Sequence, residues 1–249
     1  MGIYDVLMEH RSYRNWKDTP VEEEKIEKLL DVYRHAPSSV GMFTSSVIRV
    51  KNPEIKRQIS EVCNQEYVAN APEIFVFLVD LHRNKRLYDE LTDDNKFTPT
   101  MNYFMQGFTD AVIGTQTIEC LAEEMGLGCV YLGSILNDYD RIIEILDLPK
   151  LTFPVIGLAF GYPNPELIPM KKPKIENHSR VFTDKYKLFD SYKDELKDFS
   201  DKLTSYKYLG TDTYSNDFFT NVVNFYSMTN EKREKFFEAV KKQGFSVDV

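Results

Sequence analysis

The residues best suited to bind an anion lie next to one another near the start of the chain: His10, Arg11, Ser12, Tyr13 and Arg14. An arginine guanidinium group binds phosphate oxygens through paired N–H donors, and a serine hydroxyl adds a compact donor. This run could therefore hold a dianionic phosphate. It would also be typical of a solvated, basic end of a helix, where the helix dipole favours cations. The five residues alone do not distinguish between these two interpretations, but other features of the sequence do.

The overall charge of the chain favours the first interpretation. The 249 residues carry a formal net charge of −8, and the isoelectric point is about 5.2. An acidic chain is poorly suited to nucleic acid or an anionic membrane as its main partner. A local basic cluster in such a chain is better suited to a small anionic ligand.

Cysteine and histidine residues indicate neither a metal centre nor a disulfide framework. The spacing of Cys63, Cys120 and Cys129 provides no metal-binding pair, and their number is odd. The four histidines include no His-x-x-x-His pair, which argues against a zinc hydrolase. The first residues lack the pattern of a signal peptide, and no apolar run approaches the ~18 residues of a membrane span. We therefore expect a cytoplasmic protein without a membrane partner.

The elements that must position the basic cluster alternate along the first 160 residues. Apolar runs predict strands at residues 45–50, 74–79, 129–132 and 152–160, of which the second is apolar enough to be buried on both faces. Helical periodicity predicts a helix that starts within residues 18–24, with Pro20 in its first turn, and ends near Pro37. Further helices are expected at residues 54–63, about 100–125 and 138–146. The order indicates a layered α+β or α/β fold.

The helix at about 100–125 is apolar over much of its circumference, which predicts that it is buried centrally or at a subunit interface. Gly126 provides its C-terminal stop signal. Three charged helical patterns follow at residues 185–204, 215–226 and 231–243. They predict a peripheral helical extension. We therefore divide the chain into a core at residues 1–183 and an extension of the same domain at 184–249.

Motifs of other enzyme classes do not fit. Gly126, Gly128 and Gly133 superficially match a dinucleotide-binding fingerprint, but they follow a helix and precede a strand, which is the reverse of the required order. The chain has neither a phosphate-binding Gly-x-x-x-x-Gly-Lys-Ser/Thr loop nor a Gly-x-Ser-x-Gly nucleophile turn.

Several segments, taken in order, resemble the nitroreductase superfamily. They are His-Arg-Ser-x-Arg at 10–14, the serines at 38–39, Gly-Leu-Gly-x-x-Tyr-x-Gly at 126–133, Leu-Pro at 148–149, Gly-Tyr-Pro at 161–163 and Lys-Pro-Lys at 172–174. The set is most similar to the branch of NADPH-dependent flavin reductases and oxygen-insensitive nitroreductases. The resemblance implies an α+β layered fold with a central, mixed but mainly antiparallel sheet flanked by helices. It also implies a long central dimer helix, a C-terminal helical extension and a homodimer with FMN at each end of its interface.

The resemblance also assigns roles to individual residues. The phosphate and ribityl chain of FMN would be held by His10, Arg11, Ser12, Arg14, Lys172 and Lys174. A loop of the second subunit would contribute Ser38, Ser39 and Val40. The flavin ring would be contacted by Gln65, Leu132, Gly133 and Ser134. No catalytic side chain and no metal is implied, because the flavin carries out the chemistry.

The function implied by the resemblance is an FMN-dependent NAD(P)H oxidoreductase with a ping-pong mechanism. It would reduce small planar acceptors such as nitroaromatics, quinones or free flavin, with NADPH or NADH as donor. The branch often uses an arginine to bind the 2′-phosphate of NADPH, but residues 207–212 contain none, so we expect weak discrimination between the donors. One alternative is a non-catalytic flavin-binding or sensing protein, and another is a helical protein without flavin.

Overall fold

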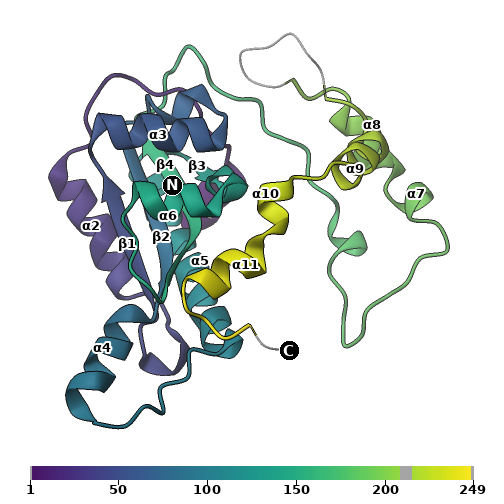
Figure 1. Ribbon diagram of the computed structural model, residues 1–249. Helices are drawn as coiled ribbons and strands as arrows, with labels where there is room; N and C mark the ends of the chain where they lie inside the picture. The colour runs from purple at the N-terminus through teal and green to yellow at the C-terminus, as the bar shows by residue number, and fades with distance from the viewer. Residues whose placement is uncertain (1, 208–214, 248–249) are drawn as a thin grey trace. The chain divides into compact units, whose positions relative to one another are not determined.

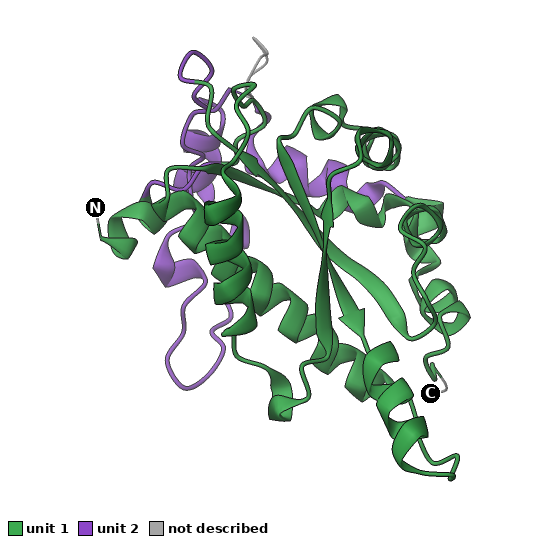
Figure 2. Cartoon of the chain, turned by 90° about the vertical axis from the view of Figure 1, so that its left-hand side faces the viewer, with its two compact units in different colours: residues 1–8, 12–164, 230–249 green, residues 9–11, 165–229 purple. Residues whose placement is uncertain are grey.

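The computed structural model describes residues 2–207 and 215–247. These residues form two compact units, which Figure 2 shows in different colours. Unit 1 contains residues 2–8, 12–164 and 230–247, and unit 2 contains residues 9–11 and 165–229. The proposed division at residue 183 stays a prediction, because compact packing units do not show which part of a chain folds independently.

A four-stranded antiparallel sheet forms the centre of unit 1. Its order is β1 (Ser45–Val50), β2 (Glu73–Asp80), β4 (Thr152–Gly161) and β3 (Gly128–Leu132). In the described sheet every neighbouring pair is antiparallel. The four predicted strands are thus confirmed to within one residue at each end. β1 and β3 are the two edge strands of this sheet, so the chain segments that adjoin them lie at opposite edges.

Helices cover both faces of the sheet (Figure 1). Alternate residues of β2 point to opposite faces. Phe75, Phe77 and Val79 pack with α2 (Glu23–Arg34) and α5 (Met101–Glu124). Ile74, Val76 and Leu78 pack with α3 (Pro53–Cys63) and α6 (Tyr139–Ile145). The layered arrangement predicted from the sequence is confirmed, and it explains why β2 is apolar without alternation.

Two details of the predicted helices in unit 1 differ from the structure. Pro20 lies before α2 rather than in its first turn, because Trp16 pairs with Pro163 and the Lys17 N–H donates to the Tyr162 carbonyl (2.9 Å). These contacts hold the preceding segment along the end of β4.

Helix α4 (His82–Leu91) was not predicted. None of its residues is buried, so it has no apolar stripe to reveal it. A short helix, α1 (Ile3–Met8), precedes the basic cluster.

Helix α5 runs through the core as predicted. Phe104, Ala111 and Ile118 are fully buried along it. The glycines of α5 allow neighbouring groups to approach closely: a methyl group at Gly107 would lie 2.6 Å from the Thr44 carbonyl oxygen, and one at Gly114 would lie 2.5 Å from the Tyr33 ring. The role of α5 at a subunit interface stays a prediction.

The helices near the C-terminus are shorter than predicted. The segment at 185–204 contains α7 (Tyr192–Glu195) and α8 (Lys197–Leu203), and residues 185–191 are not helical. Ser191 caps α7 by accepting a bond from the Asp194 N–H (3.2 Å), and aromatic rings before it pack against one another, as Phe182 does with Tyr186 (4.7 Å between centroids). Helix α9 (Phe218–Ser227) completes the helices of unit 2.

The last segment of the chain belongs to unit 1. It contains α10 (Glu231–Glu234) and α11 (Phe236–Lys242), separated at Lys235. Phe236 and Phe245 place their rings 5.9 Å and 5.0 Å from that of Phe104 on α5. The aromatic residues of this segment therefore complete the core.

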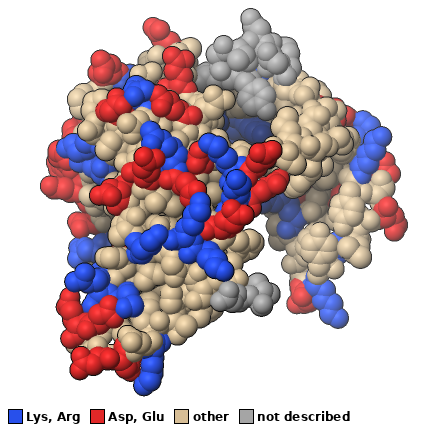
Figure 3. Space-filling view, viewed as in Figure 1, with Lys and Arg blue, Asp and Glu red and all other residues tan. Residues whose placement is uncertain are grey.

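Among the described residues, no helix combines the length and the apolar character that crossing a membrane requires. Basic and acidic side chains are interspersed on the face drawn in Figure 3.

Candidate functional site

Two of the predicted site residues meet beside the end of β3. Gln65 follows α3, whose C-cap Asn64 adopts a left-handed conformation (φ 50°) that turns the chain. Ser134 lies in the short 3-10 helix Gly133–Asn137 that directly follows β3. The Ser134 hydroxyl donates to Gln65 Oε1 (2.9 Å), and the Tyr67 hydroxyl donates to the same oxygen (2.9 Å). Because two hydroxyls fix the oxygen end of the amide, its NH₂ group provides the donor for a ligand.

Arg14 joins this group through Tyr67. Its guanidinium carbon lies 5.9 Å from the centre of the Tyr67 ring, a cation–π distance. Burial raises the pKa of the Tyr67 hydroxyl, and the charge of Arg14 partly opposes that rise. Two hydrogen bonds to β3 flank Arg14: the Tyr13 backbone N–H donates to the Cys129 carbonyl (2.9 Å), and the Trp16 side chain donates through Nε1 to the Gly128 carbonyl (2.8 Å). The segment at 12–16 is therefore tied to β3.

The backbone at Gly133 borders open space. A methyl group placed on this residue would meet no atom within 4 Å. The Gly133 carbonyl accepts a hydrogen bond from Arg233 Nη2 (3.3 Å). Arg233 lies in the last segment of unit 1. The side chain of Leu132, by contrast, is fully buried in the core. Leu132 could contact a ligand only through its backbone, whereas Gly133 leaves room for a flat group.

The loop that carries Ser38, Ser39 and Val40 lies beside β1, at the other edge of the sheet. β1 and β3 are three strand separations apart, or about 14 Å. The Ser38 hydroxyl accepts from the Phe43 N–H (3.0 Å), and Val40 is 77% exposed. The structure therefore does not bring this loop together with Gln65 and Ser134 within one chain.

The remaining predicted residues have their own surroundings. In unit 2, Glu9 accepts from Lys171 Nζ (2.7 Å) and Arg11 Nη2 (3.1 Å), and these bonds lower the pKa of the Glu9 carboxyl. Lys172 Nζ lies 6.0 Å from the centre of the Tyr206 ring. His10 and Lys174 also belong to unit 2, whereas Ser12 belongs to unit 1.

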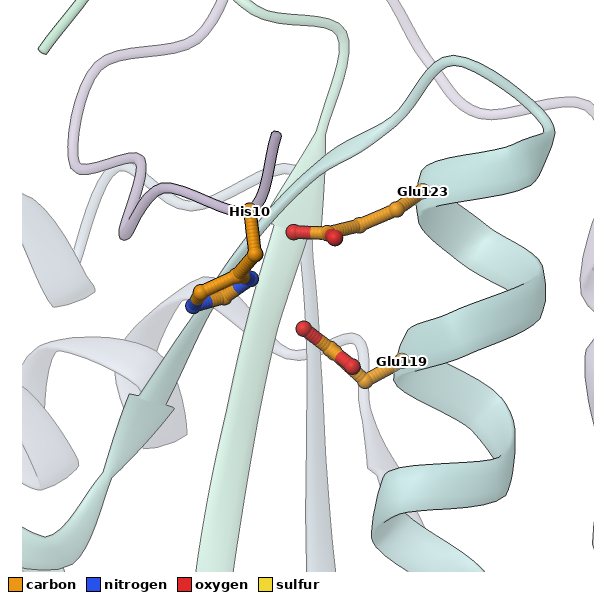
Figure 4. A group of neighbouring side chains, drawn as sticks. All are labelled: His10, Glu119 and Glu123. Carbon is orange, nitrogen blue, oxygen red and sulfur yellow. The ribbon is translucent and has the colours of Figure 1, made fainter. Parts of the chain in front are cut away.

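A buried polar group on α5 was not predicted. Glu119 and Glu123 extend from the same side of the helix (Figure 4), and Glu119 is 2% exposed. Gln116 Nε2 donates to Glu119 Oε2 (2.6 Å), and the Tyr131 hydroxyl donates to Gln116 Oε1 (2.9 Å). Burial, with a further contribution from these carboxylates, raises the pKa of the thiols of Cys120 and Cys129. Both thiols therefore stay protonated near neutral pH and are poor nucleophiles.

Sequence reasoning missed three other members of the site. Tyr67 and Arg233 form hydrogen bonds to the predicted residues Gln65 and Gly133. Trp16 anchors the segment that carries Arg14 to β3. Their sequence signals were weak, since Tyr67 and Trp16 are single aromatic residues and Arg233 lies in a charged helical pattern.

Comparisons with known proteins agree with the fold. The protein-family model of the Nitroreductase family matches residues 7–162. An NADPH-dependent oxidoreductase of Staphylococcus saprophyticus is 33% identical over 246 residues, which cover 98% of this chain and 97% of that protein. The solved structure of the hypothetical oxidoreductase YcnD from Bacillus subtilis has a TM-score of 0.89 at 27% identity and covers 100% of both chains. That of B. megaterium NfrA1 has a TM-score of 0.87 at 28% identity and covers 98% of both.

Proposed function

This chain belongs to the nitroreductase family and is an NAD(P)H-dependent oxidoreductase, and we propose that it uses FMN to reduce small planar acceptors such as nitroaromatics, quinones or free flavin. One observation carries the proposal. Arg14, Gln65 and Ser134 converge around Tyr67, beside the open backbone of Gly133. All of these residues lie inside the range matched by the family model.

The chemistry of this donor set fits FMN. The phosphate of FMN requires cationic and hydroxyl donors, and Arg14 with Ser12 can supply both. The edge of the flavin ring carries hydrogen-bonding atoms, and the Gln65 amide presents its NH₂ group in a fixed orientation. The flat face of the ring needs a neighbour without a side chain, and Gly133 provides one. The loop at 38–40 of a second subunit would complete the site, and the roles expected of Lys172 and Lys174, which belong to unit 2, stay predictions.

The chain's own residues bind and orient rather than react. FMN, when bound, accepts a hydride equivalent from the nicotinamide and passes electrons on to the acceptor. Arg14 would neutralise phosphate charge, and the Ser134–Gln65–Tyr67 hydrogen bonds would keep the amide from rotating. A reaction of this kind requires no protein nucleophile, which agrees with the protonated state of the buried thiols.

The absorption spectrum of the purified protein tests the cofactor directly. We expect the maxima of oxidised flavin, together with oxidation of NAD(P)H when a quinone or nitroaromatic is added. A protein that stays colourless after incubation with FMN would contradict the proposal. A yellow protein that does not oxidise NAD(P)H would instead support the non-catalytic flavin-binding alternative.

We expect the protein to be a homodimer. The loop at 38–40 and the Gln65–Ser134 pair lie at opposite edges of one sheet, so we expect a second chain to bring the loop to the flavin that the pair contacts. Helix α5 also exposes apolar side chains, including Met105 (52%) and Val112 (41%). Obligate interfaces are apolar and often exceed ~2,000 Å². Sedimentation should give twice the 29.1 kDa mass of the chain. A 29.1 kDa species with FMN bound at micromolar concentration would exclude this assembly.

We also expect NADPH to be preferred over NADH by less than tenfold in kcat/KM. The Staphylococcus saprophyticus relative is named as NADPH-dependent, which supports NADPH as a donor. Residues 207–212 offer a single lysine for its 2′-phosphate, and one such contact contributes about 1 kcal/mol. Of these residues, 208–212 lie outside the described part of the chain. Because we expect a ping-pong mechanism, double-reciprocal plots of the rate should give parallel lines with either donor. A ratio above about 100-fold would mean that a cation elsewhere, such as Arg180 or Lys202, binds the phosphate.

A further inference from the structure

The loop between α2 and β1 has a backbone conformation that it could not hold unaided. Val40, Gly41 and Phe43 all have positive φ angles, of 47°, 69° and 51°. This region is unfavourable for a β-branched or bulky residue. Val40 and Phe43 are also largely exposed, at 77% and 59%, so burial of their own side chains does not stabilise the loop. Strained backbone of this kind persists only when the surrounding structure fixes it, and it is often found at functional sites.

One buried carboxylate fixes both ends of this loop. Asp110, on α5, is 4% exposed. Its Oδ1 accepts from the Ser39 N–H (2.8 Å), and its Oδ2 accepts from the Thr44 N–H (3.3 Å) and the Thr44 hydroxyl (3.1 Å). Hydrogen bonds to an ionised acceptor are stronger than neutral ones, and a buried carboxylate needs such donors. Asp110 therefore joins the two ends of the loop at residues 39 and 44.

The face of α5 around Asp110 is shaped for close approach. Gly107 and Gly114 lie one turn on either side of Asp110 and share its face. Gly107 leaves room for the Thr44 carbonyl, and Gly114 leaves room for the Tyr33 ring. The Tyr33 hydroxyl in turn hydrogen bonds to Ser45 Oγ (2.9 Å), at the start of β1. Asn84 of α4 donates to the Met42 carbonyl (3.0 Å) at the outer part of the loop.

We propose that Asp110 is a positioning residue that presents Ser38, Ser39 and Val40 to the FMN bound by the second subunit. This inference rests on the proposed function. Each chain would then supply one site with its Arg14–Gln65–Ser134 group and the other site with its Asp110-held loop. Asp110 would act on a cofactor that its own chain does not hold, through the backbone N–H groups of Ser39 and Thr44.

The first test replaces Asp110 with asparagine, which keeps the size of the side chain. Its NH₂ group would face a backbone N–H at one end of the loop, so that end would be released. We expect amide hydrogen exchange at residues 39 and 44 to accelerate by about tenfold or more, and the Kd for FMN to rise by a similar factor. Exchange at residues 74–77, in the centre of β2, should not change, whereas Asp80 at its end donates to the Thr44 carbonyl (2.9 Å) and is left out of this control. Asp201→Asn is the matched control, because Asp201 forms an exposed pair with Lys197 on α8 of unit 2.

The second test asks whether the loop acts in the partner's site. A heterodimer of one Asp110→Asn subunit and one Arg14→Ala subunit would contain one site with both defects and one site with neither. We expect it to bind one FMN with wild-type affinity and to have about half the wild-type activity. If Asp110 acts within its own subunit, each site carries one defect, and no wild-type site is recovered. That result would overturn the proposal.

Two further outcomes are distinguishable. An Asp110→Asn dimer with wild-type exchange at 39 and 44 and wild-type FMN affinity would refute the role of Asp110 while leaving the proposed function intact. A wild-type chain that binds no FMN would contradict the proposed function itself. Should Asp110→Asn fail to fold, Thr44→Val removes one of the three bonds to Asp110 and should shift exchange and affinity in the same direction by a smaller factor.

Discussion

Replacement of Arg14 by alanine is expected to weaken FMN binding by about 1.5–3 kcal/mol, or roughly 10- to 150-fold in Kd. The guanidinium group is partly buried next to Tyr67, and residues on both sides of Arg14 are anchored to β3. These anchors persist in the variant, so the loss should come from the missing phosphate contact. The free energy of unfolding should change by no more than about 1 kcal/mol, the size of an exposed cation–π contact.

Fluorescence titration with FMN measures this effect, and thermal unfolding of the apoprotein serves as the stability check. Arg86→Ala is the matched control, because Arg86 is an exposed arginine on α4 and its removal changes the net charge equally. Arg11→Ala should weaken FMN binding in the same direction, although Arg11 already pairs with Glu9. Wild-type FMN affinity in Arg14→Ala would show that the phosphate lies elsewhere.

Replacement of Phe104 by alanine is expected to destabilise the fold by about 3–5 kcal/mol. Phe104 is fully buried on α5, and its ring contacts the rings of Phe153, Phe236 and Phe245 at centroid distances of 5.5, 5.9 and 5.0 Å. The substitution would leave a cavity where the sheet, α5 and the last segment of the chain meet. It should therefore also loosen residues 230–247, which supply Arg233 to the Gly133 carbonyl.

Denaturant unfolding measures the loss, and limited proteolysis reports on residues 230–247. Phe237→Ala removes the same side chain from a position that is 58% exposed, and it should cost about 1 kcal/mol or less. Equal losses in the two variants would mean that the aromatic cluster does not connect the last segment to the core.

Elements whose signals are local could be predicted from the sequence. Apolar or β-branched runs predicted the four strands of the described sheet. β2 and β4 are continuous apolar runs, because a strand buried on both faces needs no polar positions. Helix α5 was recognisable from its length and apolar circumference. The basic cluster and the glycines at 126, 128 and 133 were also local, and together with the other motifs they were enough to predict the family that the comparisons confirmed.

Local signals failed where tertiary contacts decide. Helix α4 buries none of its residues, so its pattern carried no stripe. Residues 185–191 had a helical pattern but do not form a helix, because aromatic packing and the Ser191 cap delay the start of α7. Asp110 carries a sequence signal of its own: it is a charged residue on a mostly apolar helix, and such a residue needs hydrogen-bond donors when it is buried.

Which site residues lie next to one another depends on contacts between segments that are far apart in the sequence. Gln65 and Ser134 are 69 positions apart in the sequence. They share a hydrogen bond because the C-terminal ends of α3 and β3 lie close together in the fold. The order β1-β2-β4-β3 depends on pairing between distant strands, which local periodicity does not encode. That order places Ser38 to Val40 and Gly133 at opposite edges of one sheet. It is the physical reason to expect that two chains build each site.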